Sequence, residues 1–197
     1  MITFQKIKWK NFLSTGDHFS EIDFTKNGTN LIVGTNGTGK STVLDALTFS
    51  LFNKPFRKIN KSQLINATNE KDCLVEVEFN INGKEYLVRR SIKPNLFEIE
   101  VNGQKMHKQA DDRAMQKILE ENILKVNYKS FTQIVILGSS AFVPFMQLSG
   151  TNRREVIEDL LDIRIFSAMN TIIRDKIRKQ KEEIQVLDLK KDNVKDK

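Results

Sequence analysis

The chain has 197 residues, of which 39% are hydrophobic and 29% are charged, a length and balance that suit one domain with a buried core. No apolar run approaches the roughly 18 residues that a membrane-spanning helix needs, and the N-terminus lacks the apolar core of a signal peptide. With a single cysteine, Cys73, these features predict a cytoplasmic protein without a membrane partner, while the net charge of +7 permits an acidic partner such as nucleic acid.

In the first third of the chain, apolar residues alternate over 2–10 and 19–24, which predicts two strands. Residues 31–33 are Leu-Ile-Val, predicted as a short buried strand that leads directly into a glycine-rich loop. From 42 to 52 the apolar residues recur at helical spacing, and Pro55 lies just beyond as a helix stop.

The middle of the chain predicts an antiparallel meander. Residues 73–81 alternate strongly, an Asn-Gly hairpin turn follows, and further strands are expected at 86–92 and 96–101. Cys73, at the start of this pattern, is expected to be a small core residue rather than a reactive thiol.

Basic residues gather in this meander, and they predict a surface that contacts duplex DNA through its phosphates. A generally basic, solvated surface is the alternative. Strand alternation places Arg89 and Arg90 on opposite faces, so at most one of them joins any single patch. The basic residues are Lys84, Arg89, Arg90, Lys93, Lys105 and Lys108.

The last part of the chain predicts helices. Residues 109–124 show amphipathic helical spacing, residues 132–137 read as a buried strand, and a helix from near Arg153 meets no glycine or proline through Lys197. Its apolar residues recur three and four positions apart, which indicates a coiled-coil seam rather than an ordinary surface helix. The apolar seam positions are Ile163, Phe166, Ile173, Ile177, Ile184, Leu187 and Val194.

The sequence from Gly34 to Ser41, Gly-Thr-Asn-Gly-Thr-Gly-Lys-Ser, fits the P-loop pattern G-x-x-x-x-G-K-[ST]. Its glycines allow successive backbone N–H groups to surround the phosphates of ATP, Lys40 supplies a positive charge, and Ser41 offers a hydroxyl to Mg²⁺. The predicted nucleotide-binding residues of this segment are Asn36, Gly37, Thr38, Gly39, Lys40, Ser41 and Thr42.

Hydrolysis also needs an acidic residue after a hydrophobic strand and a group that orients water. The apolar run 134–137 is followed by Gly-Ser-Ser, and Glu155, Glu158 and Asp159 lie on a predicted helix. The chain is therefore expected to contain half of an ATP site, with Lys40 as a phosphate stabiliser, and to bind ATP while hardly hydrolysing it.

Three segments resemble the N-terminal lobe of the SMC/SbcC-type DNA repair ATPases: residues 10–14, the P-loop 34–42 and residues 44–49. Further segments, such as 52–57 and 131–138, are more specifically similar to the members of this family found in phage recombination endonucleases. The resemblance implies an α/β P-loop NTPase head lobe with a mixed sheet and an antiparallel meander.

The same resemblance implies how the chain is organised and what it binds. Residues 1–160 would be the N-terminal lobe of a split ATPase head, and 161–197 the start of an ascending coiled coil. The implied partners are the C-terminal lobe of the same protein, a second head in a head-to-head homodimer, double-stranded DNA and a nuclease subunit of the SbcD type. Zinc is implied only if the coil tip, outside this sequence, carries a hook.

The implied function is the ATP-binding half of a double-strand-break repair and recombination ATPase that controls a partner nuclease at DNA ends. An SMC-like or RecF/RecN-like tethering ATPase without a nuclease is the alternative. A membrane-transporter ATPase subunit is a third possibility, which the predicted coiled coil argues against.

Three further site residues rest on the resemblance or on position alone. Ser14 would lie beside the nucleotide, and Arg57, after the P-loop helix, would approach the base or phosphates or else be a solvated loop residue. Ungapped alignment places Ser139 where the family has its Q-loop glutamine, so Ser139 is a candidate Mg²⁺ ligand, whereas Gln133 lies within the predicted strand.

Overall fold

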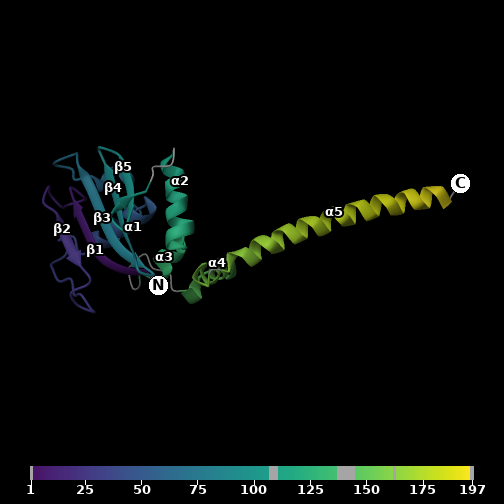
Figure 1. Cartoon of the computed structure of the whole chain (residues 1–197), viewed down its shortest axis with the longest axis horizontal. Coiled ribbons are helices and arrows are strands. Elements are labelled where there is room, and N and C mark those ends of the chain that lie inside the picture. The colour runs from purple at the N-terminus through teal and green to yellow at the C-terminus, as the bar shows by residue number, and fades with distance from the viewer. Residues whose placement is uncertain (1, 107–110, 137–144, 162, 196–197) are drawn as a thin grey trace. The chain divides into compact units, whose positions relative to one another are not determined.

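A computed structural model describes residues 2–106, 111–136, 145–161 and 163–195 (Figure 1). The chain divides into two compact units, Met1–Leu148 and Ser149–Lys197. None of the described helices combines the length and the apolar character needed to cross a membrane.

The first unit is built on a six-stranded sheet with the strand order β2-β1-β3-β4-β5-β6, of which β1 to β5 are labelled in Figure 1. Every neighbouring pair is antiparallel, and the meander predicted for the middle of the chain is confirmed as β3, β4 and β5. The strands are β1 (Ile2–Lys10), β2 (Ser20–Asp23), β3 (Cys73–Ile81), β4 (Lys84–Ile92), β5 (Leu96–Val101) and β6 (Gln104–Lys105).

The predicted mixed sheet is wrong for the described residues, because residues 31–33 form no strand. Leu31 and Val33 are 87% and 81% exposed. A strand exists only when a neighbour satisfies its backbone N–H and C=O groups, and no described strand lies beside this segment. Its apolar side chains are consequently left on the surface.

Alternation along the strands places one row of side chains in the core. Val75, Val77 and Phe79 of β3 are fully buried, and helix α1 (Thr42–Phe52) packs against β3 and β4. Cys73 is also fully buried, and burial raises the pKa of its thiol to about 12. It is therefore the core residue that was predicted, since a reactive cysteine needs a lowered pKa.

The opposite face of the sheet is charged but balanced. Arg89 on β4 lies 3.0 Å from Glu76 on β3 and 2.5 Å from Glu100 on β5, and Lys105 lies 2.8 Å from Glu98. Cross-strand pairs of opposite sign stabilise such a sheet by roughly 0.2–1 kcal/mol each. The basic charge expected of a DNA-binding meander is thus neutralised at Arg89 and Lys105, and Lys108 lies outside the described residues.

The predicted helix at 109–124 is confirmed over its described part, as α2 (Asp112–Lys117) followed by a π-helix, η2 (Ile118–Leu124). The strand predicted at 132–137 is wrong over its described part, because α3 (Tyr128–Ile134) occupies residues 132–134 and residues 135–136 form no strand. Asn127 caps this helix by accepting a hydrogen bond from the Ser130 amide at 2.8 Å. The cap and the packing of Phe131 on Phe52 decide the local structure against strand propensity.

In the second unit, the single helix predicted from near Arg153 is wrong, because two helices form: α4 (Gly150–Leu160) and α5 (Arg164–Lys195). The 3-10 helices η1 (Lys61–Leu64) and η3 (Phe145–Gln147) complete the described elements.

Arg90 fastens the end of α1 to the sheet. Its Nε donates to the Ser50 carbonyl at 2.9 Å, its Nη2 donates to Gln116 Oε1 at 2.6 Å, and its guanidinium lies 3.7 Å from the centre of the Phe97 ring. Gln116 Nε2 in turn donates to the Leu51 carbonyl at 2.9 Å. Burial lowers the pKa of Arg90 to about 9, and this buried residue cannot contact DNA.

We expect Arg90→Met to lower the free energy of unfolding by about 2–4 kcal/mol, because buried acceptors lose their charged donor. Arg89→Met, at the neighbouring position on the other face, should cost only about 1 kcal/mol, since its ion pairs are partly exposed. Urea unfolding of both variants measures the difference. Equal losses would contradict the role given to Arg90.

Candidate nucleotide-binding site

The phosphate loop takes a path that only glycine allows. Gly37 and Gly39 both have φ of +89°, a conformation that residues with a Cβ rarely adopt. A Cβ on Gly34 would lie 2.6 Å from Thr38 Oγ1. Substitution at Gly37 or Gly39 would therefore strain the loop, and substitution at Gly34 would force the Thr38 side chain to move.

Within the loop, polar groups brace the backbone. Lys40 Nζ donates to the carbonyls of Gly34 and Thr35, at 2.7 Å each, and Thr38 Oγ1 donates to the Thr35 carbonyl at 2.8 Å. Several loop amides donate to no protein acceptor within the described part of the chain, so they are available to an anion. These amides belong to Gly37, Gly39, Lys40 and Ser41.

Helix α1 begins directly after the loop and points its positive end toward it. Ser41 occupies the N-cap position, but its side chain makes no capping hydrogen bond. The hydroxyl thus stays available for a cation that accompanies the phosphates, as predicted for Mg²⁺. Ser139, the second predicted Mg²⁺ ligand, lies outside the described residues.

A cavity of about 380 Å³ opens beside the loop. All of the predicted nucleotide-binding residues except Thr38 line it, and Leu13 joins them. Thr38 instead braces the loop from within. The lining residues are Leu13, Ser14, Asn36, Gly37, Gly39, Lys40, Ser41, Thr42 and Arg57. The structure therefore brings Ser14 and Arg57, which lie outside the loop in the sequence, to the same cavity.

Ser14 is held against the loop by an asparagine that the sequence analysis did not single out. Asn66 Nδ2 donates to the carbonyls of Leu13 and Thr15, at 3.1 Å each, and the Leu13 amide donates to the Leu64 carbonyl at 2.6 Å. This fixes the turn that carries Ser14, whose Oγ lies 3.6 Å from the Cβ position of Gly39.

Arg57 is positioned by Asp45, a fully buried carboxylate on α1. Asp45 Oδ1 accepts from the Arg57 amide at 2.9 Å, and Oδ2 accepts from Arg57 Nε at 2.6 Å. The Tyr128 hydroxyl also holds the segment between α1 and Arg57, by donating to the Pro55 carbonyl at 2.8 Å. Burial, and then the negative charge of Asp45, raise the pKa of Tyr128.

Asp45 was missed in the sequence, although a signal was present. It is the one acidic residue in a largely apolar predicted helix, TVLDALTFSLF. A buried carboxylate is stable only when it is paired and hydrogen-bonded, so such a residue calls for a cationic partner nearby. The basic side chain just after the helix, Arg57, meets that requirement while remaining 47% exposed to the cavity.

Comparison with known families bears on this site. The family model of the AAA domain matches residues 6–197. The chain belongs to the AAA domain family. Its phosphate loop lies within the matched residues, which cover nearly the whole sequence.

Relatives of this AAA domain are ATPases and nuclease subunits. The chain is 42% identical to "exonuclease subunit 2" of Escherichia phage RB69 over 189 residues, 96% of this chain and 34% of that protein. It is 27% identical to the "DNA double-strand break repair Rad50 ATPase" of Thermoplasma volcanium, over 88% of this chain and 19% of that protein. It thus spans about a third, or less, of the length of the curated relatives it matches.

Among solved structures, this AAA domain is similar to the Smc head domain of Pyrococcus furiosus, determined with an extended coiled coil and bound to the C-terminal domain of ScpA. The TM-score is 0.61 at 25% identity, covering 100% of this chain and 51% of that one. These likenesses confirm the resemblance to SMC/SbcC-type ATPases drawn from residues 10–14 and the phosphate loop.

The Asp45–Arg57 pair makes an asymmetric prediction. Arg57→Gln leaves a buried carboxylate without its cation, so the free energy of unfolding should fall by about 3 kcal/mol. Asp45→Asn leaves no buried charge and should cost about 1–2 kcal/mol. Both variants should weaken ATP binding, because Arg57→Gln removes the guanidinium from the cavity and Asp45→Asn weakens the contacts that hold it there. Urea unfolding and calorimetric titration measure the two effects, and an undiminished stability of Arg57→Gln would refute this pairing.

Proposed function

We propose that this AAA domain is the ATP-binding half of a DNA repair and recombination ATPase that controls a partner nuclease acting on DNA ends. The observation that carries the proposal is the single cavity that unites the phosphate-loop amides, Lys40, Ser41 and Arg57. The names of the relatives supply the biological setting, since one is an exonuclease subunit and another a double-strand-break repair ATPase.

In the proposed complex, the loop amides and the positive end of α1 hold the β- and γ-phosphates of ATP. When ATP binds, the Lys40 ammonium gives up its hydrogen bonds to the two carbonyls and donates to phosphate oxygens instead. Ser41 takes part in holding Mg²⁺, and Ser14 and Arg57 approach the nucleotide from the rim. Mg²⁺ supplies neutralisation of the phosphate charge when bound.

The second half of the ATPase is proposed to be a C-terminal lobe of the same protein. None of the residues lining the cavity is an acidic residue or a glutamine, the groups that commonly orient the attacking water in such sites. Residues 31–33, apolar and exposed, provide backbone groups that a strand of that lobe would satisfy. Two such heads facing each other would then enclose ATP between them.

We also propose that α5 enters a coiled coil, with the lobe ending near residue 160. Ile173, Ile177, Ile184 and Leu187 recur at spacings of four, seven and three, and each is between 46% and 62% exposed. An apolar stripe of this kind on a 32-residue helix is stabilised by a partner helix. Zinc would join the assembly only at a coil tip outside this sequence.

Double-stranded DNA and an SbcD-type nuclease remain proposed partners. The balanced charges of the meander argue that DNA contacts lie elsewhere than on Arg89 and Lys105. An SMC-like or RecF/RecN-like tethering ATPase is the second candidate, favoured by the similarity to the Smc head. Copurification of the complete protein with a nuclease supports the first function. Purification of the complete protein without any nuclease supports the second.

Lys40→Ala should lower the affinity for Mg²⁺-ATP about tenfold to a hundredfold, because it removes a charge-assisted contact with phosphate. Calorimetric titration of the purified chain provides the measurement. Lys71→Ala, an exposed lysine outside the cavity, is the matched control and should bind like wild type. Equal affinities for Lys40→Ala and wild type would contradict the assignment of residues 34–42 as the phosphate-binding loop.

We further expect the isolated chain to bind ATP yet release phosphate at a negligible rate, since the water-orienting group is supplied by the other lobe. Adding the separately purified C-terminal lobe should restore turnover, with stimulation by duplex DNA. A phosphate-release assay with and without that lobe tests this. Turnover by the chain alone that disappears in Lys40→Ala would show that the active site is already complete.

A further inference from the structure

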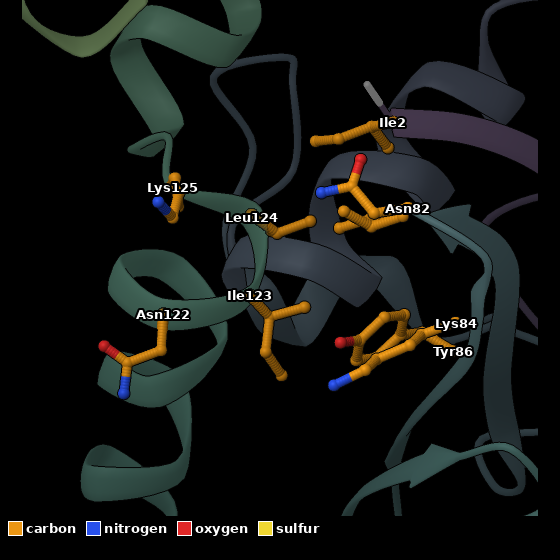
Figure 2. Close-up of a pocket in the computed structure, with 9 residues that line it drawn as sticks. Ile2, Asn82, Lys84, Tyr86, Asn122, Ile123, Leu124 and Lys125 are labelled. Carbon is orange, nitrogen blue, oxygen red and sulfur yellow. The ribbon is translucent and has the colours of Figure 1, made fainter. Parts of the chain in front are cut away.

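A second cavity, of about 340 Å³, lies between the tip of the β3–β4 hairpin and the end of η2 (Figure 2). It belongs to the first unit and shares no residue with the nucleotide cavity. Its lining residues are Ile2, Ile81, Asn82, Lys84, Tyr86, Asn122, Ile123, Leu124 and Lys125.

The interior of this cavity is apolar and well fixed. Figure 2 shows the Ile123 side chain pointing from the helix toward Tyr86 across the cavity, with Leu124 and Ile2 above. Leu124 is buried, and the Tyr86 ring stacks on Phe79 with centroids 5.3 Å apart. Such a surface accepts one large apolar side chain at little cost in reorganisation.

The rim of the cavity is cationic. Lys84 comes from the hairpin and Lys125 from the end of the helix, on different sides of the opening, and both are exposed (Figure 2). None of the nine lining residues is acidic. Asn82 and the Tyr86 hydroxyl add polar groups at the edge, so the cavity combines an aliphatic floor with positive potential.

The local backbone is unusual at the same place. The helix turns into a π-helix over Ile118–Leu124, and Lys125 then takes φ of +54°, with its amide donating to the Glu120 carbonyl. Left-handed residues at helix ends are usually glycine or asparagine, and π-helical turns recur at functional sites. This turn is what presents Ile123 and Lys125 together.

We propose that this cavity binds a short acidic segment of a partner protein. A leucine or phenylalanine side chain of the segment fills the apolar interior, and flanking carboxylates lie against Lys84 and Lys125. Charge complementarity selects the acidic segment. None of the nine lining residues is a glycine of a phosphate-binding loop, and an aliphatic lining contributes nothing to the phosphate contacts of DNA. The inference does not depend on nucleotide binding.

The probe is a synthetic hexapeptide, Glu-Glu-Leu-Glu-Phe-Glu, with blocked ends. It is titrated into the chain carrying labelled isoleucine δ1-methyl groups, and NMR spectra report each methyl. The signals of Ile2, Ile81 and Ile123 should shift, whereas a peptide with glutamine at every glutamate position should bind at least several-fold more weakly.

Lys84→Glu and Lys125→Gly should each weaken peptide binding roughly three- to tenfold. Glycine suits the backbone at position 125, so that variant removes the charge without straining the fold. Lys71→Glu is the matched control. It makes the same charge change as Lys84→Glu at an exposed site two residues before β3. The nine-residue strand, roughly 27 Å long, separates it from Ile81, so its affinity should equal that of wild type.

Three results would overturn the proposal. The first is the absence of shifts at the three isoleucines with millimolar peptide. The second is equal binding of the glutamine peptide, or an equal loss in Lys71→Glu, which would reduce the effect to general charge or apolar contact. The third is displacement of the peptide by a short random duplex that shifts the same methyl groups, which would assign the cavity to DNA.

Discussion

The burial of α1 against the sheet is the constraint on which the site depends. Every residue from Asp45 to Phe52 is buried, and Arg90 and Gln116 bind the carbonyls at its C-terminal end. A helix held in this way cannot tilt, so its N-terminal end, with Ser41 and the loop amides, stays at one place beside the sheet. The hydrophobic face of the meander is therefore what positions the anion site.

The same helix also carries Asp45, which positions Arg57 at the cavity. Asp45 is placed inside the protein, where an unpaired carboxylate would be costly. Its pairing with Arg57 offsets that cost and directs a half-exposed guanidinium toward the nucleotide cavity. Asn66 does the equivalent for Ser14 through backbone carbonyls. Both rim residues are thus fixed by buried polar partners that do not line the cavity.

Sequence patterns predicted the meander and the phosphate loop because each rests on local physics: strict alternation for the strands, and glycine at positive φ for the loop. Residues 31–33 were predicted wrongly because their strand requires a neighbour that the described chain does not provide. The strand prediction at 132–137 was wrong for a different reason, because the Asn127 cap and the packing of Phe131 on Phe52 outweigh the β propensity of these residues. Asp45 was missed because its role follows from burial, and periodicity does not assign a partner.

The positions of the charged residues distinguish the open face of the sheet from the two cavities, and the net charge alone does not. The basic residues clustered in the meander predicted a DNA-facing surface, yet Arg89 and Lys105 are matched by glutamates on neighbouring positions of the sheet. Among the described residues, Lys40 at the nucleotide cavity and Lys84 at the second cavity have no such carboxylate partner, while Arg57 keeps part of its guanidinium exposed despite its pairing with Asp45. Anionic ligands are therefore expected at the cavities rather than on the open face of the sheet.

The central claim is that the loop before α1 holds the phosphates of ATP. It is tested most directly by following backbone amide signals in NMR spectra while Mg²⁺-ATP is added. The account predicts large shifts for the amides of Gly39, Lys40 and Ser41, with a smaller shift at the Arg57 side chain. Saturable binding that leaves these loop amides unchanged and shifts signals elsewhere would contradict it.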